Sequence, residues 1–215
     1  MTSPAFFLQG KPALRPSPLR APYHALALAI AAIWFDAPPV RAGDARHLMY
    51  ASVDATADGG YGGIGWMMAP NGLDHSGPVF SAETGRSLTP ENRAAAMAGW
   101  RVSTHKTIVT LLGGFEAATT LRPVASADVW WDNAGWMATG RVQATTDYAS
   151  WRIAIGRKAS ERLPWIGPEV SSAGEESRFG AHVTAIRLPA GVEARASAGW
   201  SKRGAFGELS LWRRF

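Results

Sequence analysis

Apolar and polar residues alternate with a period of two along most of residues 43–215. In residues 192–202, Val, Ala and Trp alternate with Glu, Arg, Ser and Gly, and residues 135–145 repeat the pattern. Successive side chains of a β-strand point to opposite sides, so this period indicates strands with one apolar and one polar face. Gly, Pro, Asp and Asn interrupt the pattern at short intervals, as turn residues do.

These interruptions divide the chain into segments of about ten residues joined by short turns, a spacing typical of an antiparallel up-and-down transmembrane β-barrel. We therefore expect an all-β fold of about 12 strands, forming one domain over residues 43–215. The expected strands are 47–56, 60–68, 77–86, 91–102, 105–117, 124–132, 135–145, 148–157, 163–172, 178–187, 192–202 and 205–215.

A soluble β-sandwich would show the same alternation with its apolar face buried. Two features favour a barrel that faces lipid. The apolar faces consist largely of Ala, Gly and Trp, which fill a sandwich core poorly. Tryptophans also fall on the apolar register near segment ends, as expected for aromatic girdles at two membrane interfaces. These tryptophans are Trp66, Trp100, Trp131, Trp136, Trp151 and Trp200.

The last segment supplies a third feature. Gly207, Leu209, Leu211 and Phe215 share one face of it, and Phe215 ends the sequence. A terminal aromatic residue on an amphipathic strand resembles the signal read by the outer-membrane barrel assembly machinery, although Arg213 departs from that pattern. An even strand number would return both termini to the periplasmic side.

Residues 1–42 have the layout of a secretory signal peptide. Basic residues precede the uncharged apolar run 25–35, and the small-residue site Val40-Arg41-Ala42 follows it. Eleven helical residues rise only about 16 Å, too little to span a bilayer, although a short membrane anchor or a buried helix would share this pattern. The expected location is therefore the outer membrane.

Composition and charge narrow the function classes. The chain has no cysteine, which excludes disulfides, Cys-ligated metal sites and thiol nucleophiles. Its formal charge is +5, but removal of residues 1–42 leaves 18 of the 22 basic and 16 of the 17 acidic residues. No Lys/Arg run remains that suits a phosphate backbone, so we expect no nucleic-acid partner.

Most remaining charges fall on the polar register, which would face the barrel interior. The acidic residues are Asp54, Glu83, Glu116, Asp128, Glu169, Glu193 and Glu208, and the basic residues are Arg93, Arg101, Lys106, Arg141, Arg152, Arg178, Arg195 and Arg214. Seven acidic and eight basic groups predict an ion-pair network in the lumen. A path for a polar solute is the alternative. Trp130, Trp165 and Trp212 also point inward, where they would fill the lumen or stack on a sugar ring.

Catalytic signals are weak. The histidines of residues 43–215 lack metal-ligand spacing, and no known nucleotide or nucleophile motif occurs. Ser103 and His105 would share a face if their strand continued, which is the only pattern that suggests a lipid hydrolase. We therefore expect no enzyme, no catalytic residues, no metal and no cofactor.

One motif is distinctive. Ile166-Gly167-Pro168-Glu169, followed by Ser171 to Glu176 and Arg178-Phe179-Gly180-Ala181, resembles the cellulose biosynthesis protein BcsS family of alphaproteobacteria. Gly199-Trp200, the closing Arg214-Phe215 and the early segments 61–65 and 73–77 fit the resemblance too. It implies an exported, outer-membrane β-protein that accompanies cellulose synthase, and it carries no catalytic residues. Pro168 cannot donate to a strand ladder, so we expect a local kink beside the inward Glu169.

These patterns lead to one main expectation, a non-enzymatic outer-membrane barrel accessory to cellulose biosynthesis or export. Its partners would be outer-membrane lipid, the barrel assembly machinery through Phe215, and cellulose synthase or secretion components or glucan. A channel for small polar solutes and a Ser/His lipid hydrolase remain alternatives.

Overall fold

The computed structural model describes residues 45–56, 59–87, 92–174 and 176–215. The expected signal peptide, residues 1–42, lies outside the described residues. Within the described part, no helix is long and apolar enough to cross a membrane.

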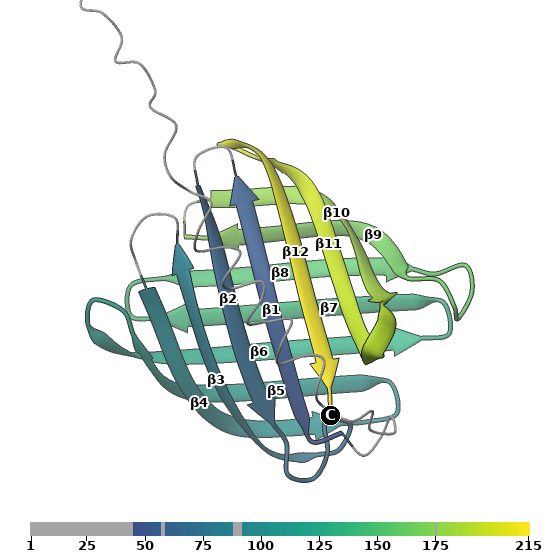
Figure 1. Ribbon diagram of the computed structural model, residues 1–215, viewed down its shortest axis with the longest axis horizontal. Helices are drawn as coiled ribbons and strands as arrows, with labels where there is room; N and C mark the ends of the chain where they lie inside the picture. The colour runs from purple at the N-terminus through teal and green to yellow at the C-terminus, as the bar shows by residue number, and fades with distance from the viewer. Residues whose placement is uncertain (1–44, 57–58, 88–91, 175) are drawn as a thin grey trace, which may run out of the picture. The chain divides into compact units, whose positions relative to one another are not determined.

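The chain forms a closed antiparallel barrel of twelve strands, in which each strand pairs with its neighbours in sequence and β1 pairs with β12 (Figure 1). This confirms the expected fold class. The strands are β1 (His47–Thr56), β2 (Gly59–Met68), β3 (Gly77–Ser87), β4 (Asn92–Ser103), β5 (Thr107–Ala117), β6 (Leu121–Asn133), β7 (Trp136–Thr145), β8 (Ala149–Arg157), β9 (Trp165–Ala173), β10 (Glu176–Arg187), β11 (Val192–Ser201) and β12 (Gly204–Arg214).

Pairing at Phe215 completes the closure between the first and last strands. The backbone N–H of His47 donates to the Phe215 carbonyl at 2.8 Å, and the Phe215 N–H donates back to the His47 carbonyl at 2.9 Å. A closed barrel leaves no unpaired edge, which is the condition for strands to span lipid. We call the edge where β1 begins and β12 ends the terminal rim; the connections 69–76, 104–106, 134–135, 158–164 and 188–191 lie there.

The outer face of the barrel is apolar and exposed. Its large side chains include Val53, Phe80, Trp100, Leu111, Phe115, Val129, Val142, Ile153, Ile155, Ile166, Val170, Phe179 and Leu209, each at least 39% exposed. All six tryptophans expected on this register lie on it. Trp66, Trp100, Trp131 and Trp136 are near the terminal rim, and Trp151 and Trp200 are near the other rim.

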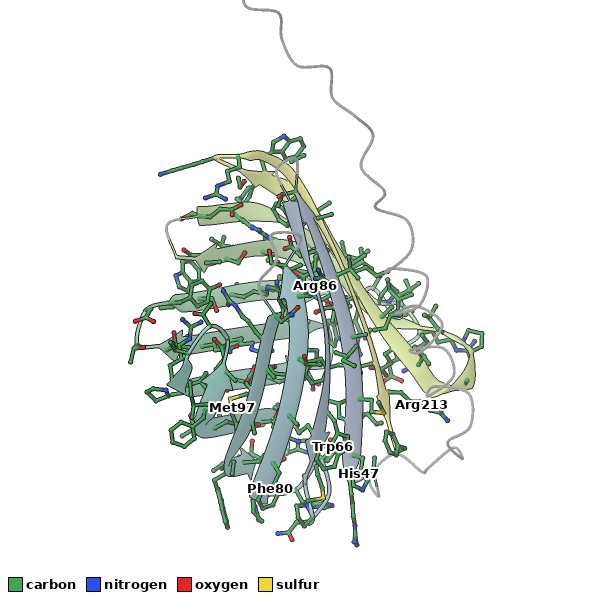
Figure 2. All side chains as sticks on the ribbon, turned by 60° about the vertical axis from the view of Figure 1, so that its left-hand side comes forward. His47, Trp66, Phe80, Arg86, Met97 and Arg213 are labelled. Atoms are coloured by element: carbon green, nitrogen blue, oxygen red, sulfur yellow. The ribbon has the colours of Figure 1, made fainter. Side chains whose placement is uncertain are left out.

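An aromatic stack crosses the seam of the barrel at the terminal rim. The His47 ring lies between those of Trp66 and Phe215, with centroid distances of 5.7 and 5.4 Å. Figure 2 shows His47 and Trp66 side by side near one end of the barrel, with Phe80 close by. The stack therefore joins β1, β2 and the end of the chain on the outer face.

Two expectations about the segment after β4 were wrong. The strand ends at Ser103, and β5 begins only at Thr107, where Thr104 and Thr107 close a turn through their hydrogen bonds. Lys106 consequently lies in this turn and not on the inner face. His105 also lies there and is exposed, so it does not continue the alternation from Ser103.

Candidate functional site: the charged interior

Glu169 is the most deeply buried acidic group of the inner face, with its side chain 1% exposed. One carboxylate oxygen pairs with the Arg195 guanidinium from β11, and the other lies 3.4 Å from Nε of Arg152 on β8. Arg152 in turn pairs with both carboxylate oxygens of Glu208 on β12. Three strands separate β8 from β12 in the sheet order, so this pair crosses the lumen. In Figure 1, β1, β2 and β12 cross in front of β6, β7 and β8, which brings inner side chains of distant strands together.

The motif around Glu169 explains how the carboxylate reaches this position. Ile166 faces outward and is 57% exposed, whereas Gly167 faces inward against β8. A Cβ at Gly167 would lie 1.9 Å from the Ile155 carbonyl oxygen, so only glycine fits there. Pro168 faces outward, as expected from the alternation, and directs Glu169 inward. The four residues thus combine an exposed outer side chain, a close backbone approach and a buried charge.

His182 supports the same region from β10. The residue is 1% exposed, its Nε2 lies 3.1 Å from the Ile155 carbonyl oxygen, and its Nδ1 lies 2.8 Å from Oγ1 of Thr184. A carbonyl only accepts, so Nε2 must carry a proton and donate to it. His182 is therefore a structural group that satisfies the Ile155 carbonyl beside Gly167.

A further ion pair ties β10 to β1. Arg178 pairs with Asp54 on β1 and donates through Nε to Glu176 at 3.1 Å. Two strands, β11 and β12, separate β1 from β10. Together with the Glu169 group, this pair links β8, β9, β10, β11, β12 and β1 through ion pairs on the inner face.

A second group of polar side chains lies between β1, β3, β6 and β7. Arg141 lies 3.7 Å from Glu83 and 3.6 Å from Asp128, and Gln143 donates to Glu83 at 3.4 Å. Tyr50 donates its hydroxyl to Glu83 at 2.8 Å, with its ring over Gly65, where a Cβ would lie 2.1 Å away.

This second group is open to solvent although it faces inward. The side chains of Arg141 and Asp128 are 43% and 37% exposed, against 1% for Glu169 and 8% for Glu208. The long, weak contacts of Arg141 agree with this exposure. We call the part of the interior around Glu169 and Glu208 the sealed side, where Arg152 is the most exposed member at 31%, and the part around Arg141 is the more exposed one.

Both rims carry further charged contacts. At the rim opposite the termini, Arg122 donates through Nε to Glu116 at 2.9 Å and lies 3.3 Å from Asp147, while Arg93 lies over the Tyr148 ring at 5.2 Å. At the terminal rim, Arg214 donates to Asp74 at 2.5 Å.

The connection 69–76 covers part of the interior at the terminal rim. Leu73 is 3% exposed, and Arg101 on β4 donates to the Leu73 carbonyl, to Oγ1 of Thr110 at 3.0 Å and to the sulfur of Met67 at 3.1 Å. Leu73 packs in an apolar cluster whose other members are Ala45, Ala69, Val79, Ala95, Met97, Leu112 and Val124, with Leu48 and Met67 against it. Apolar side chains therefore line this part of the inner wall.

The structure brings most of the expected network residues into ion pairs, and the remaining ones have other described contacts or positions. Lys106 lies in the turn after β4. Arg101 contacts the neutral groups described above. Glu193 accepts from Nε1 of Trp212 at 2.9 Å, and Arg93 makes the aromatic contact with Tyr148. Trp130, Trp165 and Trp212 lie on the inner face of their strands.

The sequence analysis did not include six participants: Tyr50, Gln143, Arg122, Glu176, Asp74 and Asp147. Glu176 precedes the expected start of its strand at residue 178, whereas β10 begins at Glu176. The alternation directs Tyr50 and Gln143 inward, but the expected network consists of charged groups, and these two side chains are neutral. Arg122 was missed because β6 was expected to begin at residue 124 and begins at Leu121. Asp74 and Asp147 lie in connections, where strand alternation gives no direction.

The chemistry of this interior is that of paired charges. Among the described residues, no three His, Asp or Glu side chains converge as a metal site. Near Ser103, the observed contacts are with Ser76, whose hydroxyl accepts from the Ser103 N–H at 2.9 Å. No imidazole takes part in those contacts, so the geometry does not support the lipid hydrolase alternative.

Solved porin structures share the fold. The KdgM porin in complex with disordered oligogalacturonate matches with a TM-score of 0.60 and 10% identity, covering 78% of this chain and 99% of that chain. A second KdgM porin structure matches with a TM-score of 0.57 and 11% identity, with the same coverage of both chains. At such low identity, the likeness shows a porin-like barrel and nothing about the solute.

Sequence comparison finds a family match over part of the chain. No curated protein matches the chain. A family model does match, from β6 to Phe215, across the Ile166–Glu169 motif and the sealed side of the interior. Residues 124–215 match the cellulose biosynthesis protein BcsS family, and this match confirms the predicted resemblance over that part of the chain, whereas segments 61–65 and 73–77 lie outside it.

Proposed function

We propose that the chain is a non-enzymatic outer-membrane β-barrel that assists bacterial cellulose biosynthesis or export. The family match over residues 124–215 carries this proposal. The exposed apolar outer face, with tryptophans near both rims, supports insertion into lipid. The partners would be outer-membrane lipid, the barrel assembly machinery that inserts the chain, and components of cellulose synthesis or secretion.

Location and role need separate experiments. Membrane fractionation followed by electrophoresis of heated and unheated samples should give an outer-membrane band that shifts on heating, because a closed barrel resists detergent until it is boiled. A clean deletion should lower the amount of extracellular cellulose, and the intact gene should restore it. Unchanged cellulose after deletion would contradict the accessory role, and a soluble protein without a heat shift would contradict the location.

Passage of small polar solutes is a second candidate function. The water-accessible side chains of Arg141 and Asp128 inside the barrel favour it. The expected result is ion conductance of the purified protein in planar bilayers, altered in Arg141→Gln. A stable barrel without conductance would exclude this function.

A further inference from the structure

Two inward tryptophans lie at the terminal rim with part of their surface exposed. Trp130 lies on β6, which ends at Asn133, and Trp212 lies on β12, which ends at Arg214. Both residues are half-buried. The third inward tryptophan, Trp165, is only 6% exposed and is covered by the Lys158 ammonium, 4.2 Å from its ring. Trp165 therefore fills space, whereas Trp130 and Trp212 remain accessible.

The sheet order places these two rings on opposite walls. Strands β1–β5 separate β12 from β6 on one side of the closed barrel, and β7–β11 separate them on the other. The two tryptophans thus face the lumen from opposite sides of the same rim.

The polar edge of each indole already has a partner. Nε1 of Trp212 donates to Glu193 at 2.9 Å, and Nε1 of Trp130 donates to Asp132 at 3.0 Å. A donated N–H fixes the orientation of the ring, and what the indole then offers a ligand is its flat face. Each ring also has a carboxylate beside it that accepts hydrogen bonds.

A flat apolar face beside a carboxylate matches the chemistry of a neutral sugar ring. Such a ring presents C–H groups on its faces and hydroxyl donors around its edge, so it stacks on the indole and donates to the carboxylate. An acidic sugar is disfavoured at the two indole faces, because its carboxylate would approach Asp132 and Glu193, and like charges repel at close range. The nearby Arg214, by contrast, is already paired with Asp74. The observations therefore favour an uncharged glycan.

We propose that the terminal rim binds a neutral glucan chain between Trp130 and Trp212. This inference rests on the proposed function in cellulose biosynthesis, which supplies the glucan as the available neutral glycan. Asp132 and Glu193 position the rings and accept hydrogen bonds from sugar hydroxyls.

Isothermal titration calorimetry of the full barrel in detergent tests this site with cellohexaose as the neutral probe and hexagalacturonate as the acidic one. We expect binding of cellohexaose at millimolar concentration or below, and weaker binding of hexagalacturonate. Absence of cellohexaose binding in the unaltered protein would overturn the proposal, and so would tighter binding of hexagalacturonate.

Variants then assign the binding to the rings. Trp130→Leu and Trp212→Leu should each raise the dissociation constant about ten-fold, equivalent to about 1.4 kcal/mol. Trp212→Phe, which keeps a flat face, should raise it less than Trp212→Leu. The matched control is Trp100→Leu, since Trp100 lies on the outer face with 56% exposure and should leave the constant unchanged. Folded Leu variants that bind as tightly as the unaltered protein would mean that the rings only fill the lumen.

The result of the binding test can be distinguished from the result of the test of the proposed function. Loss of cellulose in the deletion strain without cellohexaose binding would leave the accessory role standing and remove the glucan site. Cellohexaose binding that depends on both tryptophans, together with unchanged cellulose in the deletion strain, would keep the glycan site and contradict the role in cellulose production.

Discussion

Replacing Glu169 with glutamine tests whether the sealed side of the interior stabilises the barrel. The substitution keeps the size of the side chain and removes its charge. Glu169 is 1% exposed and pairs with Arg195, whose side chain is 12% exposed. Arg152 keeps its contact with Glu208 in the variant, so Arg195 is the group that loses its compensating charge.

The magnitude follows from this geometry. Two unit charges 4 Å apart attract by about 4 kcal/mol at an effective dielectric constant of about 20. Removal of one partner of a buried ion pair costs about 3–5 kcal/mol, because the other charge stays desolvated. Glutamine keeps a neutral acceptor for the guanidinium, so we expect a loss at the lower end of this range, a decrease of about 3 kcal/mol in the free energy of unfolding.

Urea unfolding of the barrel in detergent micelles, followed by tryptophan fluorescence, measures this change. With a slope of about 1–3 kcal/mol per molar urea, the midpoint should fall by about 1–3 M. The double variant Glu169→Gln/Arg195→Met also removes the cation that Glu169→Gln leaves without a compensating charge. It should be more stable than the sum of the two single changes predicts, by about 1 kcal/mol or more.

Two control variants define what would refute this reasoning. Glu193→Gln keeps an acceptor for Trp212, and Asp128→Asn alters a charge that is 37% exposed and 3.6 Å from Arg141. Each should change stability by less than about 1 kcal/mol. A Glu169→Gln variant that loses no more stability than these controls would refute the reasoning. Strictly additive changes in stability in the double variant would also refute it.

Three further predictions concern other parts of the barrel. Deletion of Phe215 removes its backbone pairing with His47 and their ring stack, so the yield of heat-modifiable barrel in the outer membrane should fall; normal yield would contradict a role in assembly. Gly167→Ala places a Cβ 1.9 Å from the Ile155 carbonyl oxygen, and urea unfolding should show a loss of about 2 kcal/mol or more, whereas a neutral result would mean that the two strands separate easily. If the interior conducts ions, Arg141→Gln should raise the preference for cations over anions measured in planar bilayers, because it removes an accessible positive charge. Unchanged selectivity would place the ion path elsewhere.

The sequence determined the architecture because one local rule governs it. Side chains alternate across a strand, so the pattern of apolar and polar residues assigned faces as well as strands. Outward Trp100 and Trp200 and inward Glu169 follow from this rule alone. Errors in the expected direction of a side chain arose where the rule stops, at strand ends, as for Lys106 and Arg122.

Which inner charges meet was decided by the tertiary structure. Alternation places Arg152 and Glu208 on the inner face, but their strands are not neighbours in the sheet, and only the crossing of the barrel walls brings them together. Likewise, Asp74 reaches Arg214 because the connection 69–76 folds over the terminal rim. A sequence pattern carries the direction of each side chain relative to its own strand, whereas distances across a closed barrel depend on how all twelve strands are tilted and registered together.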